Sequence, residues 1–235
     1  MLTSEALTKV FGTKTAVDQV SLSLEPGHIY AMLGPNGSGK TTWMKMAAGL
    51  CKPTFGSVSF NGEPVGVRSR ASIAYMSTEP YFYPWMTIRD VGNYYQDFFA
   101  DFSMLRYSEL LARFELDEKL KTKALSSGMM AKAKIAVTLA RDAKVWMLDE
   151  PFNGIDLLAR DRIKECIIES AAEDKLLLLS SHLVEEMEAI ADRAVFLREG
   201  QLVKTVDVEE SRNETGLSIA DDYRQIYGHQ GGEQA

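Results

Sequence analysis

Residues 34–42 read Gly34-Pro35-Asn36-Gly37-Ser38-Gly39-Lys40-Thr41-Thr42 and follow directly on the apolar segment 28–33. They match the pattern G-x-x-x-x-G-K-[ST] at every fixed position, and a helix-forming segment follows at 43–48. Glycines allow positive φ, so that successive backbone N–H groups can point at phosphates, where the helix also directs the positive end of its dipole. Lys40 supplies a charge for the terminal phosphates, and Thr41 supplies a hydroxyl for Mg²⁺. The stretch therefore predicts a loop that binds a nucleoside triphosphate.

The composition indicates one large domain, or one domain with an appended lobe, in 235 residues that are 46% hydrophobic and 25% charged. No apolar run approaches the roughly 18 residues of a membrane span, and the first residues do not resemble a secretion signal. The net charge of −7 argues against a nucleic-acid binder, which would carry a basic stripe. Cys51 and Cys166 lack metal-ligand spacing, so we expect packing residues in a reducing cytosol.

Short strand and helix patterns alternate along most of the chain, which is typical of an α/β fold. Residues from about 80 to 135 differ, because apolar residues recur there at three- and four-residue spacings without a strand pattern. We therefore expect a helical lobe inserted at about 80–135. From residue 207 the chain is polar, with a short helix expected at 217–227 and a frayed end at 228–235.

Two adjacent acids, Asp149 and Glu150, follow the apolar strand pattern at 145–148. The carboxyl ends of such strands form the ligand-binding edge of open α/β sheets. Asp149 suits a residue that holds Mg²⁺ through a water, and Glu150 suits a base that polarises the attacking water. Two surface acids at a strand end are the alternative, but the phosphate loop upstream favours a functional role.

A serine-glycine segment, Ser126-Ser127-Gly128-Met129, lies at the start of a helix predicted near 129–142. A serine hydroxyl and a glycine at a helix start can form a second anion site. Capping of the helix by Ser126 or Ser127 explains the same residues without any ligand. Taken alone, the segment favours capping.

In combination and in this order, the motifs resemble those of the nucleotide-binding subunits of ATP-binding cassette (ABC) transporters, over residues 2–206. Two further motifs complete the order: Asn153-Gly154-Ile155-Asp156, and His182 after an apolar strand. The resemblance implies an α/β fold with a P-loop NTPase core, an antiparallel β subdomain and an inserted α-helical subdomain. It places an ABC ATPase domain at 1–206 and leaves 207–235 as a polar C-terminal extension.

The resemblance also implies roles for single residues. Phe11 stands where an aromatic side chain stacks on adenine, with packing in the core as the alternative. Residues 126–129 occupy the family signature, which would cover the γ-phosphate bound by a second, opposed subunit. Asp156 resembles the aspartate that crosses between the two sites, and His182 the histidine that contacts the γ-phosphate. The expected catalytic residues are Lys40, Glu150 and His182, and the expected metal ligands are Thr41 and Asp149.

The chain departs from the family pattern at three places. The signature reads Ser-Ser-Gly-Met where Ser-Gly-Gly-Gln is common, and Asn153 replaces a serine. Thr78 stands where a glutamine normally reaches Mg²⁺ and the attacking water, and threonine is too short to do the same. Glu79 could take that role only if the loop shifted by one residue. We expect hydrolysis to survive with slower or looser coupling.

The resemblance implies a cytoplasmic ATPase subunit at the inner face of the cell membrane, with ATP and Mg²⁺ as cofactors. Its partners would be a transmembrane permease subunit, which alone would hold it at the membrane, and a second ABC ATPase subunit in a homo- or heterodimer, without nucleic acid. The aromatic segment 81–86 would either receive a permease helix, with Tyr81 and Trp85 exposed, or pack the helical lobe internally. The sequence looks most like export systems for drugs or peptides. The alternatives are a non-transport ABC ATPase and a regulatory module with weak hydrolysis.

Overall fold

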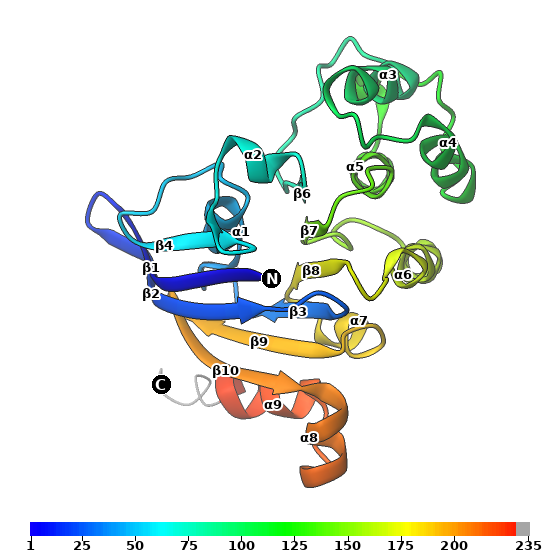
Figure 1. Cartoon of the computed structure of the whole chain (residues 1–235). Coiled ribbons are helices and arrows are strands. Elements are labelled where there is room, and N and C mark those ends of the chain that lie inside the picture. Colours follow the sequence, from blue (N-terminus) through cyan, green and yellow to red (C-terminus); the bar gives the residue numbers. More distant parts are fainter. Residues whose placement is uncertain (229–235) are drawn as a thin grey trace.

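A computed structural model describes residues 1–228. The frayed end was expected at 228–235, and all of it except Gly228 lies outside the described residues. Two sheets form the framework of the chain (Figure 1). The four-stranded sheet has the order β2-β1-β4-β5, and each neighbouring pair in it is antiparallel. Its strands are β1 (Leu2–Phe11), β2 (Lys14–Leu24), β4 (Phe55–Phe60) and β5 (Glu63–Pro64). A hairpin turn at Asn61-Gly62 joins β4 to β5, with φ of 51° and 82°.

The six-stranded sheet has the order β10-β9-β3-β8-β7-β6. All pairs from β9 to β6 are parallel, and β10 joins β9 as an antiparallel edge strand. The strands are β3 (Ile29–Leu33), β6 (Ile73–Met76), β7 (Val145–Asp149), β8 (Leu176–Ser181), β9 (Arg193–Arg198) and β10 (Gln201–Asp207). Because β3, β6, β7 and β8 run in one direction, the segments that follow them meet at one edge of the sheet.

Nine helices connect and cover these strands in the described chain. They are α1 (Lys40–Ala47), α2 (Val67–Arg70), α3 (Ile88–Phe98), α4 (Met104–Arg113), α5 (Ser127–Leu139), α6 (Leu157–Ser170), α7 (Val184–Glu188), α8 (Val208–Thr215) and α9 (Ile219–Tyr227). The helical stretch expected at about 80–135 contains α3, α4 and most of α5, which form the lobe at the top of Figure 1. The helices α2 and α8 were not expected from the sequence.

Alternate residues of the parallel strands pack into two different cores, which fixes the position of α1. Trp146 and Leu148 of β7 pack with the lobe and α6, whereas Met147 packs with the four-stranded sheet and α1. Trp43 of α1 is fully buried there, and its indole Nε1 donates to Ser4 Oγ at 3.3 Å. Helix α1 is thereby held between both sheets, with its first residue, Lys40, at the edge where β3 ends.

The C-terminal helices pack on the same fold. Val208 and Ile219 are buried in the core that contains the lobe, and the Tyr227 hydroxyl donates to Leu197 O at 2.8 Å. Helix α8 ends at Gly216, whose left-handed φ of 70° suits glycine. The boundary between an ATPase domain at 1–206 and an extension at 207–235 stays a prediction.

Candidate functional site

The loop between β3 and α1 owes its shape to glycines. Gly34, Gly37 and Gly39 have φ of 153°, 83° and 104°. A Cβ at Gly34 would lie 2.3 Å from Leu197 O, and one at Gly39 would lie 2.6 Å from Ala16 O, so both positions require close backbone approach. At Gly37 nothing lies within 4 Å of such an atom, and only the backbone conformation demands glycine. The predicted phosphate loop is therefore a tight turn packed on neighbouring backbone.

A cavity of about 360 Å³ opens beside this loop. Its lining residues come from five parts of the chain: the β1–β2 hairpin, the loop with the start of α1, and the segments after β6, after β7 and after β8. They are Lys14, Ala16, Asn36, Gly37, Ser38, Gly39, Lys40, Thr41, Thr42, Thr78, Glu150, Asn153 and His182. The fold thus brings most of the predicted phosphate loop together with Glu150 and His182.

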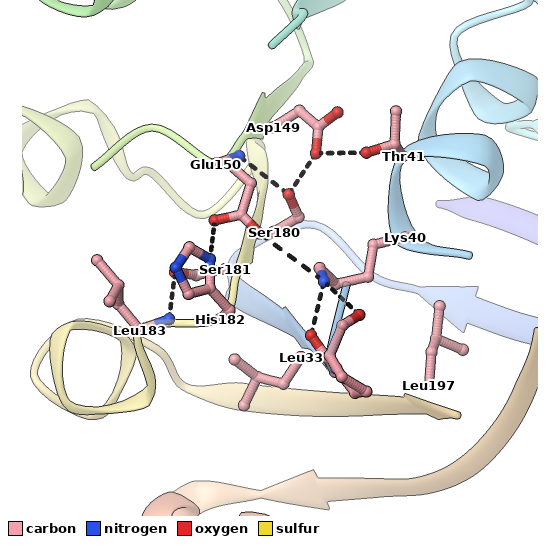
Figure 2. A network of polar contacts seen from close by, with 12 residues as sticks. Leu33, Lys40, Thr41, Asp149, Glu150, Ser180, Ser181, His182, Leu183 and Leu197 are labelled. Atoms are coloured by element: carbon pink, nitrogen blue, oxygen red, sulfur yellow. Dashed lines mark hydrogen bonds and ion pairs between the residues drawn. The ribbon is translucent and has the colours of Figure 1, made fainter. Parts of the chain in front are cut away.

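The Lys40 ammonium is buried and turns back on its own loop. Its Nζ donates to Gly34 O at 2.6 Å and to Pro35 O at 3.2 Å, and it lies 3.7 Å from Glu150 Oε1 (Figure 2). Burial lowers the pKa of Lys40, and the Glu150 and Asp149 carboxylates act against this shift. These contacts hold the Lys40 ammonium group between its own loop and Glu150, on the lining of the cavity.

Three hydroxyl groups surround the fully buried Asp149 carboxylate. Thr41 Oγ1 donates to Asp149 Oδ1 at 3.1 Å, Ser180 Oγ donates to the same oxygen at 2.5 Å, and the Tyr75 hydroxyl donates to Oδ2 at 3.1 Å. Burial, together with the Asp149 charge, raises the pKa of Tyr75, which therefore stays a donor. Thr41 and Asp149 offer adjacent hydroxyl and carboxylate oxygens, which are ligands that Mg²⁺ accepts.

Glu150 lies between two nitrogen groups. Its Oε1 faces Lys40, and its Oε2 lies 2.9 Å from Nδ1 of His182 (Figure 2). The Glu150 backbone has a positive φ of 51°, which costs energy for a residue with a side chain. The Ser180 hydroxyl accepts a hydrogen bond from the Glu150 N–H at 3.0 Å and so secures this conformation. The carboxylate is thus fixed at the cavity wall by tertiary contacts.

The signature segment and Asp156 do not line this cavity. Ser126 Oγ accepts a hydrogen bond from Met129 N at 3.2 Å, which is the helix cap that the sequence also allowed. Asp156 caps α6 by accepting from Ala159 N at 3.0 Å, and this bond lowers the pKa of Asp156. The two segments meet each other, since a Cβ at Gly128 would lie 2.7 Å from Gly154 O.

The structure decides between alternatives at Phe11 and at positions 78–79. Phe11 is 52% exposed with Lys9 Nζ 5.0 Å from its ring centre, so packing of this ring in the core is wrong. Thr78 lines the cavity, whereas the exposed Glu79 carboxylate binds Lys45 Nζ at 2.7 Å. A one-residue shift that would place Glu79 in the cavity does not occur.

The aromatic segment that follows β6 is divided between surface and interior. Trp85 is 65% exposed, as expected, and stacks on the exposed Tyr83 with ring centres 5.8 Å apart. The expectation that Tyr81 is exposed was wrong, because its hydroxyl is buried and Lys134 Nζ lies 5.1 Å from its ring centre. Met86 is part of the core.

Sequence reasoning missed several residues that shape the site. Ser180 is the most important, because it contacts both Asp149 and Glu150. Its place at the end of an apolar strand, two residues before His182, could have indicated it. Tyr75 and Ala16 carried no such signal, because an aromatic or alanine residue in a strand is usually a packing residue.

Comparisons with known proteins agree with this geometry. A family model described as ABC transporter matches residues 17–153. The lantibiotic transport ATP-binding protein SrtF of Streptococcus pyogenes is 32% identical over 220 residues, covering 91% of this chain and 93% of that protein. The Nod factor export ATP-binding protein I of Burkholderia orbicola is 35% identical over 203 residues, covering 83% of this chain and 67% of that protein.

Solved structures show the same fold. An ATP-binding subunit of an ABC transporter superposes with a TM-score of 0.85 at 25% identity, covering 96% of this chain and 99% of that one. A dimeric ATP-binding cassette in a post-hydrolysis state, bound to ADP and Pi, has a TM-score of 0.79 at 21% identity and covers 88% of this chain and 98% of its own.

Fold and cavity together define a nucleotide-binding cassette with ATPase activity. The chain belongs to the ABC transporter family, as the matched model and the relatives require. The expected α/β fold with a P-loop NTPase core is thereby confirmed. Within residues 1–228, no helix has both the length and the apolar character needed to cross a membrane.

Proposed function

We propose that this chain is the ATPase subunit of an export-type ABC transporter, which dimerises around two ATP molecules and drives a separate membrane-spanning subunit. One observation carries the proposal: the phosphate loop, Glu150 and His182 line one cavity, with the buried Asp149 bound to Thr41 of that lining, while the signature segment 126–129 does not line it. A complete site would combine this cavity with the signature of a second copy. Asp156, which follows the Gly154 contact, would cross between the two sites.

The residues around the cavity suit ATP with Mg²⁺. The glycine loop and Lys40 would hold the phosphates, Thr41 would ligate Mg²⁺ directly, and Asp149 would hold it through a water. Phe11 is exposed on the β1–β2 hairpin that also supplies Lys14 and Ala16 to the cavity, so its ring is available to stack on adenine. Mg²⁺ supplies charge neutralisation at the phosphates when it is bound.

Glu150 is the proposed base for hydrolysis. Its carboxylate is held by the Ser180 contact at its backbone and by His182 at its side chain, so it can accept a proton from a water in the cavity. His182 remains 39% exposed and would contact the γ-phosphate. Lys40 would neutralise the charge that develops on the phosphates.

Two further observations support export as the direction of transport and a contact between this chain and a permease. Two relatives are named for lantibiotic transport and Nod factor export. Tyr83 and Trp85 present a stacked aromatic pair on the lobe surface, which suits the docking of an apolar permease helix at the inner face of the membrane. We assign residues 1–206 to the ATPase domain and 207–235 to a C-terminal extension, whose helices α8 and α9 pack on that domain.

Glu150→Gln tests the assignment, because it keeps the shape of the side chain and removes its basicity. We expect ATP turnover to fall by about 10²–10⁴, while ATP still binds and stabilises a dimer detectable by size-exclusion chromatography. Glu63→Gln, on the exposed β5, is the matched control and should hydrolyse normally. Unchanged turnover in Glu150→Gln would refute the base, and an ATP-bound monomer would refute the shared site.

A further inference from the structure

The chain crosses between the sheet core and the helical lobe at two places. It leaves the core after β6 through residues 77–79, and it returns along α5, which leads back to β7. Residues 77–79 include Thr78 at the cavity wall. Helix α5 begins at the signature segment. A contact between these two crossings would connect the cavity with the signature.

Lys134 makes that contact. It lies on α5, five residues or about one and a half turns after Met129 of the signature, and only 4% of it is exposed. Its Nζ donates to Ser77 O at 3.1 Å, to Thr78 O at 3.0 Å and to Glu79 O at 2.7 Å. An ammonium group has three donors, and three successive carbonyls accept them.

The charge of Lys134 is balanced by dipoles more than by acids. Burial lowers the pKa of Lys134, and the Glu79 carboxylate acts against this shift. That carboxylate is itself exposed and bound to Lys45 of α1. Exposed pairs of this kind contribute little to stability, whereas Lys134 is a buried charged donor that binds three successive carbonyls of the loop. Lys134 is therefore the main support of the loop.

We propose that Lys134 is a positioning residue for ATP hydrolysis, which holds the 77–79 backbone against α5 and thereby sets the place of Thr78 in the cavity. This inference rests on the hydrolysis site proposed above, although it concerns a residue outside the cavity.

Lys134→Met tests the inference, because methionine keeps much of the apolar stem and removes all three donors. We expect kcat for ATP to fall by about 10- to 100-fold, with KM changed by less than about twofold, since Lys134 does not line the cavity. Lys134→Gln, whose amide keeps two donors, should give an intermediate kcat. It also serves as the second variant if Lys134→Met does not fold.

A double-mutant cycle with Thr78→Ala tells whether Lys134 acts by positioning Thr78 or only by stabilising the fold. If Lys134 acts through Thr78, Thr78→Ala alone lowers kcat, and the double variant is no slower than the slower single variant, because interacting residues give non-additive effects. An unchanged kcat in Thr78→Ala would show that Lys134 does not act through the Thr78 side chain. Multiplicative losses, or an unchanged kcat in Lys134→Met or Lys134→Gln, would overturn the inference.

Lys175→Met is the matched control. Lys175 is also buried, and it binds Asp142 Oδ1 at 2.5 Å and Ala143 O at 2.9 Å before the amino end of β7, away from the cavity. It should lower the melting temperature and leave kcat unchanged; an equal fall in kcat would mean that Lys134 contributes only stability. Glu150→Gln is measured in parallel: if it retains turnover, the proposed hydrolysis site fails, whatever Lys134→Met does.

Discussion

The cavity beside the phosphate loop and the signature end of α5 differ in the contacts within the chain that hold their residues in place. In the cavity, Asp149 accepts three hydroxyl hydrogen bonds, and Lys40 is held by two carbonyls of its own loop. At the signature, Ser126 caps its own helix. The cavity is preformed by tertiary contacts, whereas at the signature segment Ser126 and Ser127 are exposed and Gly128 packs on Gly154. This difference fits the proposed site, in which the cavity of one copy would be completed by the signature segment of a second.

The strongest test of this comparison changes the signature and leaves the cavity alone. Gly128→Ala places a Cβ 2.7 Å from Gly154 O, so the contact between the signature and the segment before Asp156 must shift. We expect hydrolysis to fall by about 10- to 100-fold, while the affinity of the monomer for ATP stays within about twofold of the unaltered chain. Steady-state ATPase assays and ATP titration of the monomer measure the two quantities.

A matched control for this variant is Gly66→Ala at the start of α2. There the nearest atom to a new Cβ is Pro64 O at 4.0 Å, an ordinary contact. Normal turnover is expected. A loss of monomer ATP binding in Gly128→Ala would show that the two regions are not separate.

A smaller effect on turnover is expected at Thr78, where the chain departs from the family pattern. Thr78→Gln restores the side chain that the family places at this wall, and the cavity has Thr78 on its lining. We expect turnover to rise several-fold, by about 1 kcal/mol of transition-state stabilisation. A lower steady-state rate in this variant would contradict the hypothesis that Thr78 slows hydrolysis.

The last effect is on stability and leaves turnover aside; it concerns the contact between α7, which follows His182, and α6, which follows Asp156. Glu186 of α7, just after His182, accepts from Arg160 Nη1 at 3.0 Å and from Lys164 Nζ at 2.9 Å, both on α6, which follows Asp156. Burial raises the pKa of Glu186, but these two hydrogen bonds outweigh it and hold the pKa below its ordinary value of 4.5. The pair therefore stabilises the fold above about pH 4.5, and the stabilisation is lost as the pH falls through the lowered pKa.

Glu186→Gln should accordingly lower the free energy of unfolding by about 1–2 kcal/mol at pH 7. The difference from the unaltered chain should narrow as the pH falls below about 4.5. Urea unfolding at a series of pH values measures both. Glu185→Gln, at the exposed neighbour on the same helix, should change stability by less than about 0.5 kcal/mol. A pH-independent difference would show that the ion pair is not its source.

The sequence predicted the elements with the strongest local patterns. The phosphate loop, the strand before Asp149 and the helices of the lobe follow from glycine spacing and apolar periodicity. It did not predict α8, because a polar helix that is fixed mainly by Asp207 and Gly216 at its ends has no apolar stripe to reveal it. It misjudged Tyr81, because a run of aromatic residues does not tell which ring lies over a buried lysine.

The sequence by itself determined the phosphate loop, the order of the motifs and the residue types of the cavity, because these depend on local spacing and side-chain chemistry. Only the tertiary structure decided which polar groups meet. Ser180 reaches Asp149 because β8 lies beside β7 in parallel register, and Lys134 reaches residues 77–79 because α5 returns past the exit of β6. Such contacts join residues far apart in the chain, and their partners are set by strand order and packing.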